Sequence, residues 1–130
     1  MKKFFIVLTF LSVLNSCSIK EETVTEIKGG TIEEQMIEAY NEGVVALDKG
    51  DVYYAAKKFN EAELLYPQSE WAPKSSLMAS YAYWSQGYFN DSIRELKRFI
   101  RLYPKNKNLD YAHYLLAMNF YDSIVDEKKI

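Results

Sequence analysis

Few side chains in this 130-residue sequence are of the kinds that perform covalent or metal chemistry, and they occur singly. Cys17 is the only cysteine and His113 is the only histidine. Metal sites and nucleophilic dyads need at least two such groups in contact. A single histidine cannot form a His–His metal pair, and we expect no Cys–His dyad in the mature chain. The sequence therefore predicts that the protein is not an enzyme and has no metal or cofactor, with His113 structural or at the surface.

Two other local patterns could suggest chemistry but have simpler explanations. Glu33, Glu34 and Glu38 bring three carboxylates to the start of an expected helix, where the helix dipole favours negative charge whatever the function. The Gly29-Gly30 pair is not followed by Lys and Ser or Thr, so it does not form a phosphate-binding loop. Neither pattern predicts a catalytic or nucleotide site.

The distribution of charge limits the class of partner. The formal net charge is −2, and the Lys and Arg residues are interleaved with Asp and Glu along the chain. Nucleic-acid binding normally needs a basic stripe or patch, so we expect no nucleic-acid partner. One small basic cluster contains Lys97, Arg98 and Arg101. We expect it to be a solvated helix face, with a contact for an acidic partner as the alternative.

The first residues have the pattern of an export signal. Lys2 and Lys3 precede an apolar run over residues 4–13, which is too short to span a membrane, because a spanning helix needs about 20 residues. The run ends at Leu14-Asn15-Ser16-Cys17, which resembles the lipobox of bacterial lipoproteins. That resemblance implies that residues 1–16 are removed as a signal peptide and that Cys17 is lipidated. Two or more acyl chains would then anchor the protein to a membrane.

Residues 17–30 are expected to be the lipidated N-terminus and a flexible tether. The stretch is polar, ends in Gly29-Gly30 and shows no helical spacing of apolar residues. In lipoproteins of bacteria with an outer membrane, Asp directly after the lipidated cysteine favours retention in the inner membrane. This position is Ser18 here. The resemblance therefore implies the cell outer membrane, with the protein on the periplasmic face.

The rest of the chain, residues 31–130, contains an internal repeat with an offset of 37 residues. The segments GDVYYAAKKFNEAELLYP (50–67) and GYFNDSIRELKRFIRLYP (87–104) both begin with Gly and end with Tyr-Pro. Periods of about 20–50 residues indicate stacked helical or solenoid units. With 48% hydrophobic residues, the chain also has ample material for a core.

Helix start and stop signals agree with this organisation. Thr31 and Glu34 have the spacing of a capping box, Asp51 and Asn108 can cap later helices, and glycine or proline follows the apolar segments. The sequence therefore predicts five helices, near residues 31–49, 51–66, 71–86 and 89–103 and from 108 onward.

These helix pairs resemble the tetratricopeptide repeat, which has about 34 residues. Its consensus has small residues at positions 8, 20 and 27, a large apolar residue at 24 and proline at 32. With Pro67 and Pro104 at position 32, these four positions are Gly43, Ala55, Ala62 and Phe59 in one copy, and Ser80, Ser92, Phe99 and Leu96 in the next.

In the second copy Phe99 replaces the expected small residue. The resemblance implies an all-α tetratricopeptide-repeat solenoid of antiparallel helix pairs. It would have about 2.5 repeats, near residues 33–67, 70–104 and 107–130, the last of them incomplete. A generic helical array or a helical bundle is the alternative. We expect the second helices, with Phe59, Ala62, Leu96 and Phe99, to form the packing spine.

Together, the lipobox, the tether and the repeats resemble the BamD family of outer-membrane assembly lipoproteins. The most specific part is RFIRLYP (98–104) followed by DYAHYL (110–115). Because that family has more repeats than this chain contains, we expect a C-terminal truncation, with a shortened relative as the alternative. The last helix should then have an apolar face without a partner, including Leu115, Leu116 and Phe120.

The family resemblance implies a scaffold and substrate receptor of the BAM complex, which assembles and inserts β-barrel outer-membrane proteins. Partners would be a BamA-like barrel protein, the other BAM lipoproteins and the aromatic-rich C-terminal β-signals of unfolded outer-membrane proteins. Tetratricopeptide arrays bind peptides through positions 5, 9 and 12 of each first helix. Here these positions are Tyr40, Val44 and Leu47; Leu77, Tyr81 and Trp84; and Tyr114, Met118 and Tyr121.

A groove lined by such side chains suits an extended peptide with aromatic anchors. Tyr81, Trp84, Tyr114 and Tyr121 are the favoured binding residues, because tyrosine and tryptophan give a large contact area at low entropic cost. Val44, Leu47 and Leu77 fit a core position equally well. The alternative function is another periplasmic tetratricopeptide lipoprotein, acting as a protein-interaction adaptor in envelope biogenesis or cell division.

Overall fold

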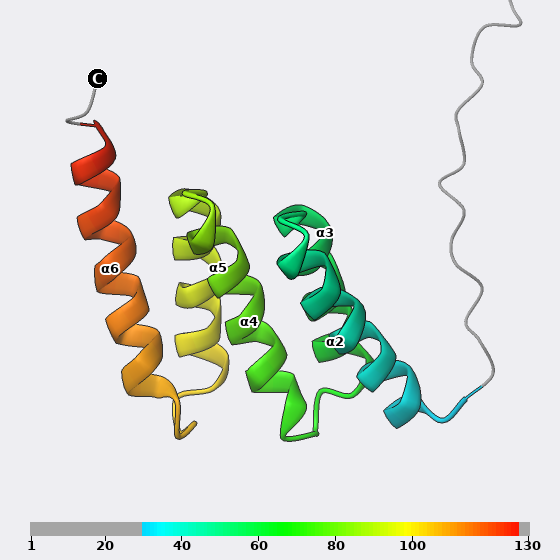
Figure 1. Cartoon of the computed structure of the whole chain (residues 1–130). Coiled ribbons are helices and arrows are strands. Elements are labelled where there is room, and N and C mark those ends of the chain that lie inside the picture. Colours follow the sequence, from blue (N-terminus) through cyan, green and yellow to red (C-terminus); the bar gives the residue numbers. More distant parts are fainter. Residues whose placement is uncertain (1–29, 128–130) are drawn as a thin grey trace, which may run out of the picture.

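The computed structural model describes residues 30–127, which form five consecutive α-helices. They are α2 (Ile32–Asp48), α3 (Val52–Leu65), α4 (Trp71–Ser85), α5 (Phe89–Leu102) and α6 (Leu109–Glu127). Figure 1 shows them side by side in chain order, and each packs against the next. The predicted all-α fold of helix pairs is confirmed, with α2–α3 and α4–α5 as pairs and α6 packed against the second pair. The expected signal peptide and Cys17 lie outside the described residues.

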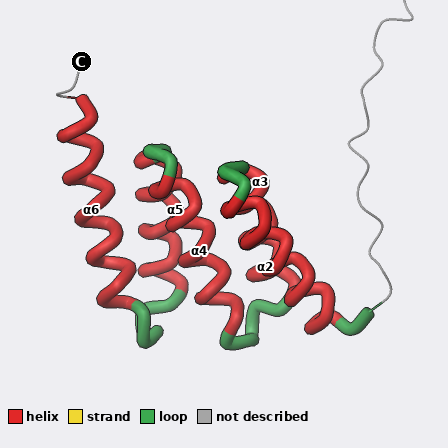
Figure 2. Tube along the Cα trace, in the orientation of Figure 1, coloured by secondary structure: helices red, strands yellow, loops and turns green. Residues whose placement is uncertain are grey.

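The connections between helices lie on two opposite edges of the array. The short turns α2–α3 and α4–α5 lie on one edge, and the longer connections α3–α4 and α5–α6 lie on the other (Figure 2). We call the second one the loop edge and define it by residues 66–70 and 103–108. Because first helices run in the same direction, α4 and α6 both begin at the loop edge.

The predicted helix starts are confirmed at two positions. The Thr31 hydroxyl accepts the Glu34 amide at 3.2 Å, and the Glu34 carboxylate accepts the Thr31 amide at 2.8 Å. Asp51 Oδ1 accepts the Tyr54 amide at 3.2 Å at the start of α3. Each cap satisfies a backbone donor that the helix itself cannot, which stabilises the helix by about 1 kcal/mol.

Both short turns depend on a glycine in the left-handed region. Gly50 has φ +79° and Gly87 has φ +78°, a conformation that costs other residues energy because of their Cβ atom. In each turn the amide of the following residue, Asp51 or Tyr88, donates to a carbonyl five residues earlier at 3.0 Å. This bond pattern is that of the Schellman motif. The two copies of the repeated segment therefore begin with the same turn.

The core lies where the small residues of first helices meet the second helices. A Cβ atom at Gly43 would lie 2.8 Å from the ring of Phe59, so only glycine allows α2 to approach α3 this closely. In the next pair, the Ser92 hydroxyl donates to the Ser80 carbonyl at 2.8 Å, and both serines are fully buried. The predicted spine is confirmed, because its four members are fully buried: Phe59, Ala62, Leu96 and Phe99.

The expectation that Lys97, Arg98 and Arg101 form one solvated face is wrong for Arg98. Its guanidinium reaches between α3 and α5 and makes a two-point contact with the buried Glu63 carboxylate, at 2.6 and 2.9 Å. Tyr103 also donates to Glu63, at 2.6 Å. We call the whole network the Arg98 clasp; its members are Asn60, Glu63, Ser76, Glu95, Arg98 and Tyr103.

The clasp joins α3, α4 and α5 across the boundary between the first two helix pairs. Burial lowers the pKa of Arg98, but its hydrogen bonds and charge contact with Glu63 outweigh this effect and raise it. Burial raises the pKa of Tyr103, and the bond to Glu63 raises it further. Arg98 therefore stays charged and the Tyr103 hydroxyl stays protonated over the physiological range.

The apolar face of α6 differs in part from the prediction. Leu115 is only 1% exposed, because it packs against Leu77, Leu96 and Phe99 of the preceding pair. The exposed stripe instead contains His113, Ala117, Phe120 and Ile124. The positions that match Ala117, Gly43 in α2 and Ser80 in α4, meet their own second helices. Among the described residues no such helix follows α6, so this stripe remains uncovered.

Within residues 30–127, none of the helices combines the length and apolar character needed to span a lipid bilayer.

Candidate functional site

The nine predicted groove residues fall into distinct environments, beginning with position 5 of each first helix. Tyr40 and Leu77 are 9% and 8% exposed and belong to the core. The Tyr40 ring packs edge-on against Phe59 at 5.3 Å and Trp71 at 5.0 Å between centroids, and burial raises its pKa. Leu77 packs against α6. These two side chains face the next helix pair and are not available to a ligand.

Tyr114 occupies the same position in α6 but is 59% exposed. Its counterparts are covered by the first helix of the following pair, and no helix follows α6 among residues 30–127. The exposure of Tyr114 therefore reflects its place at the end of the described array. Exposure alone does not mark it as a binding residue.

Positions 9 and 12 present a more continuous surface. The half-buried residues there are Val44, Leu47, Tyr81, Trp84 and Met118. The rings of Tyr81 and Trp84 lie 5.7 Å apart, and Tyr121 is 63% exposed. The Trp84 indole donates to Asp122 on α6 at 2.9 Å, so its polar end is occupied while part of its ring remains exposed. These side chains keep contact area for a partner while their inner surfaces pack against the core.

Sequence reasoning missed position 2, which lies one turn before position 5 on the same side of each first helix. Ile37 and Tyr111 are 38% and 45% exposed there, and Lys74 is also exposed. Residues three apart lie on the same helix face, so this spacing could have identified them. We define the first-helix face as positions 2, 9 and 12: Ile37, Val44, Leu47, Lys74, Tyr81, Trp84, Tyr111, Met118 and Tyr121.

Tyr111 joins the aromatic groups of α4 and α6. Burial raises its pKa, and the nearby Tyr81 and Tyr114 hydroxyls raise it further. The rings of Tyr111 and Tyr114 are 6.3 Å apart, which is within the range for favourable aromatic contact. Tyr81, Trp84, Tyr111 and Tyr114 thus form an aromatic cluster across the boundary between the second and third helix pairs.

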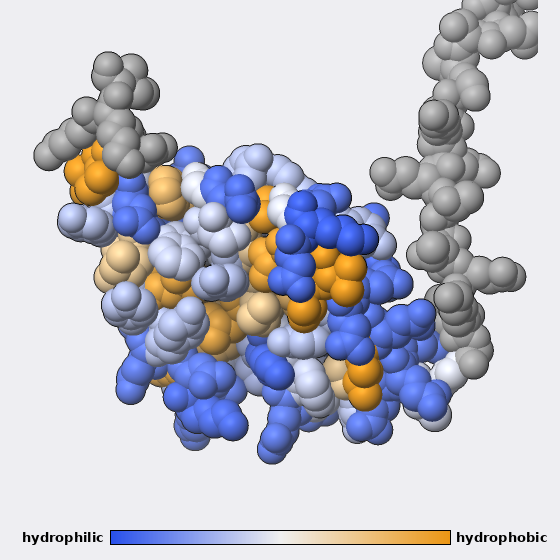
Figure 3. All heavy atoms as spheres, viewed as in Figure 1, coloured by the Kyte–Doolittle hydropathy of each residue, from blue (hydrophilic) through white to orange (hydrophobic). Residues whose placement is uncertain are grey.

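Lys74 carries the positive charge of the first-helix face. Its ammonium nitrogen lies 4.3 Å from the Trp71 ring centroid and 5.0 Å from that of Tyr40. Two cation–π contacts hold the ammonium close to the loop edge. Figure 3, in the orientation of Figure 1, shows that this lower edge is hydrophilic, whereas hydrophobic and neutral side chains gather along the helices above it.

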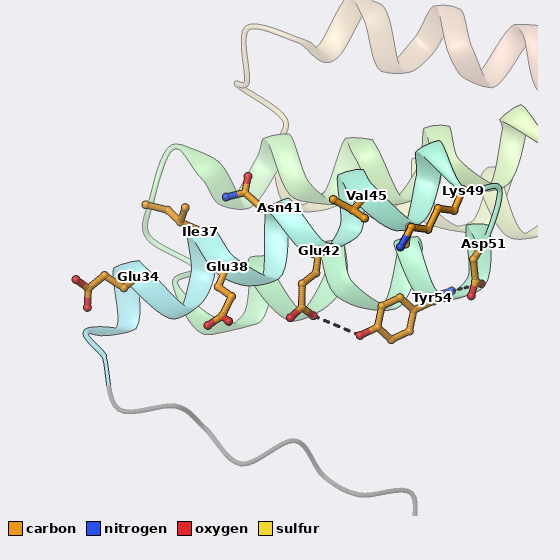
Figure 4. Close-up of a pocket in the computed structure, with 10 residues that line it drawn as sticks. Glu34, Ile37, Glu38, Asn41, Glu42, Val45, Lys49, Asp51 and Tyr54 are labelled. Carbon is orange, nitrogen blue, oxygen red and sulfur yellow. Dashed lines mark hydrogen bonds between the residues drawn. The ribbon is translucent and has the colours of Figure 1, made fainter.

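A hollow of about 690 Å³ lies along α2 and the start of α3, and Ile37 of the first-helix face also lines it. Figure 4 shows Ile37, Asn41 and Val45 along one side of α2, with Glu38 and Glu42 along the other. The carboxylate of Glu42 accepts from Tyr54 at 3.3 Å and pairs with Lys58 at 2.9 Å.

Two other carboxylates at this hollow have structural roles as well. Glu34 belongs to the α2 capping box and Asp51 caps α3. Burial lowers the pKa of Lys58, but hydrogen bonds to Glu42 and Glu61 outweigh it and raise the value. No group of three His, Cys, Asp or Glu residues among those described could hold a metal ion.

Comparison with known proteins identifies the family. A family model described as "Outer membrane lipoprotein" (YfiO) matches residues 32–129. Among curated proteins, the outer membrane protein assembly factor BamD of Caulobacter vibrioides is 39% identical over 95 residues, covering 72% of this chain and 31% of the relative. The protein of that name from Rickettsia prowazekii is 31% identical over 114 residues, covering 88% and 43%.

A BamD from Neisseria meningitidis is 28% identical over 118 residues, covering 91% of this chain and 44% of the relative. The chain thus spans less than half of the length of these relatives. No solved structure matches it. The match to the family model covers all five helices described above. The chain belongs to the YfiO family of outer membrane lipoproteins.

Proposed function

We propose that this chain is part of a non-catalytic scaffold and substrate receptor for the assembly of β-barrel outer-membrane proteins. Relatives named outer membrane protein assembly factor BamD support a role in the assembly of outer-membrane proteins. The observation that carries the receptor role is the first-helix face, where the exposed parts of Tyr81, Trp84, Tyr111 and Tyr121 offer aromatic surface on adjacent first helices. Rigid aromatic side chains of this kind are typical anchors for bound peptides.

The proposed ligand is an extended peptide from the aromatic-rich C-terminus of an unfolded outer-membrane protein. Aromatic side chains of such a peptide would pack between Tyr81 and Trp84 on α4 and Tyr111 and Met118 on α6. Burial of one aromatic ring contributes about 1.5–3 kcal/mol, whereas association costs about 4–15 kcal/mol, so two anchors need further contacts along the peptide to give measurable binding.

The remaining assignments concern anchoring and partners. Residues 1–16 would be a signal peptide, Cys17 a lipidated anchor and residues 17–30 the tether of a repeat domain over 31–130. The face would then be held at the periplasmic side of the outer membrane. A BamA-like barrel protein and the other BAM lipoproteins would be the assembly partners.

Peptide binding tests the receptor role. The full chain in detergent micelles is titrated against a fluorescent ten-residue peptide that ends in phenylalanine, with fluorescence anisotropy as the readout. Replacing two hot-spot aromatics with a polar residue removes about 2 kcal/mol or more, so Tyr111→Ser with Tyr121→Ser should weaken binding at least about tenfold. Tyr66→Ser is the matched control, because Tyr66 is 40% exposed but lies outside the first-helix face.

Unchanged affinity in the double variant, with helical circular dichroism retained, would contradict the proposed receptor face. The scaffold role has its own test, a pulldown with the tagged chain from detergent-solubilised envelopes. Recovery of a BamA-like barrel protein supports it. Recovery of a cell-division or other envelope complex without the barrel protein would favour the adaptor function instead.

A further inference from the structure

A second hollow, of about 460 Å³, lies at the loop edge beside the first-helix face. It is formed by the first turn of α4 and by the connection between α5 and α6. Three lysines, Lys74, Lys105 and Lys107, line it together with a single carboxylate, Glu70. The local charge is therefore positive, although the chain as a whole is acidic.

One of these lysines, Lys74, is held in place by its neighbours. The contacts of Lys74 with Trp71 and Tyr40 hold its ammonium over aromatic rings, which leaves its other side turned toward solvent. Asn106 and Asn108 also line the hollow and are half-buried. The Asn108 amide donates to Asn106 Oδ1 at 2.9 Å, which orders this part of the connection. The hollow thus combines positive charge with an ordered wall.

We propose that this hollow binds the free terminal carboxylate of the peptide whose aromatic side chains occupy the first-helix face. The proposal rests on the receptor function above and specifies which end of the ligand is recognised. Ammonium groups and amide donors are suitable partners for a carboxylate, and hydrogen bonds to charged groups are stronger than neutral ones. We choose a chain end as the occupant because the hollow adjoins an aromatic surface. An aromatic-rich C-terminal segment carries both a carboxylate and aromatic side chains.

The spacing along the helices suits such a ligand. Tyr81 lies seven residues after Lys74 in α4, which corresponds to about 10 Å along the helix axis. Tyr111 lies one turn beyond Asn108. An extended peptide advances about 3.3 Å per residue, so a side chain three residues before the terminal carboxylate would reach the aromatic cluster.

Amidation of the peptide tests this directly. The full chain in detergent micelles is titrated with two versions of the fluorescent ten-residue peptide, one with a free C-terminal carboxylate and one with a C-terminal amide. We expect the free acid to bind about tenfold more tightly, and this ratio to fall toward one at 1 M salt, because exposed charges are screened there.

Substitutions of Lys105 and Lys107 test whether these lysines cause the tighter binding of the free acid. Lys105→Gln with Lys107→Gln should reduce the ratio of acid to amide affinity to about twofold or less without changing binding of the amide. Lys57→Gln, on the exposed side of α3, is the matched control and should keep the full ratio. Lys74 is left intact in these variants, since its loss would also uncover Tyr40 and Trp71.

The outcomes separate the two proposals. Equal binding of acid and amide by the unmodified chain overturns the carboxylate site but leaves the receptor face standing. A tenfold ratio that the double variant does not reduce also overturns it. A third peptide carries a C-terminal amide and a glutamate near its end. If it binds as tightly as the free acid, the hollow recognises an acidic side chain, and the proposal of a chain end is overturned. If neither peptide binds better than one with serine in place of its aromatics, the receptor function fails, and the carboxylate site fails with it.

Discussion

The Arg98 clasp gives the sharpest prediction about stability. Replacing Arg98 with methionine keeps the aliphatic stem but removes the charge and leaves the Glu63 carboxylate, whose side chain is 6% exposed, without its cation. Loss of one partner of a buried ion pair costs about 3–5 kcal/mol. Arg98 is 28% exposed, so water can replace part of the contact, and we expect a loss at the lower end, about 3 kcal/mol.

Arg94→Met is a control on the same helix. Arg94 makes an ion pair with Asp91 at 2.6 Å that has the same three-residue spacing as the pair of Arg98 with Glu95, but its side chain is 65% exposed. Exposed pairs contribute about 0–1 kcal/mol, so this variant should lose no more than about 0.5 kcal/mol. Urea unfolding at pH 7, followed by circular dichroism, gives the free energy of unfolding for both variants.

A second variant tests the physical cause. If the cost comes from the uncompensated carboxylate, adding Glu63→Leu to Arg98→Met should recover about 2 kcal/mol, because an apolar pair of similar volume can replace a buried ion pair. Equal losses for Arg98→Met and Arg94→Met would refute the reasoning. Failure of the double variant to recover any stability would assign the loss to packing instead.

Three further predictions follow from the contacts described above. Gly43→Ala should lower the free energy of unfolding by about 1–3 kcal/mol in thermal melts, because its Cβ would lie 2.8 Å from Phe59. Gly50→Ala, at φ +79° with nothing within 4 Å, should cost about 1 kcal/mol. A stabilising effect of Gly43→Ala would contradict the close contact, because it would show that the Phe59 ring moves easily. The raised pKa of Tyr103 means that its contribution to stability is complete below the unfolded value of about 10 and is lost as pH rises above it. Stability of the unmodified chain should therefore decline more steeply above pH 10 than that of Tyr103→Phe. Parallel declines of the two chains would contradict this. Lys58, whose pKa is also raised, contributes equally to both chains, so the comparison subtracts its contribution. Asp122→Ala removes the acceptor of the Trp84 indole and should cost about 1 kcal/mol with a shift in tryptophan fluorescence, whereas an unchanged spectrum would show that the bond does not persist in solution.

Much of the fold could be predicted because its signals are local. The capping box at Thr31, the Asp51 cap and the glycines at 50 and 87 each act within one helix turn, and the structure places all of them as expected. The small residues at Gly43 and Ser80 were identifiable because the tetratricopeptide consensus requires close approach of helices there. The offset of 37 residues then assigned the same roles to both copies.

The Arg98 clasp could not be predicted, because its members come from three helices and the residue after α5, and its contacts span up to 40 residues. Arg98 and Lys97 look alike in the sequence, and only the placement of Glu63 distinguishes them. The same limit applies to the first-helix face. Tyr40 and Tyr81 have equivalent aromatic character, but Trp71 covers Tyr40 from the next pair, and no local pattern shows this.

The bond between Trp84 and Asp122 has a mechanical consequence. In a solenoid each unit contacts only its neighbours, so the curvature of the array depends on the few contacts that join successive first helices. Trp84 and Asp122 lie toward the C-terminal ends of α4 and α6, away from the loop edge. Bending between the second and third pairs should therefore pivot at this point, and its amplitude should increase toward the N-terminal ends of the two helices. The N-terminal ends of α4 and α6 can therefore move apart while their C-terminal ends keep their spacing.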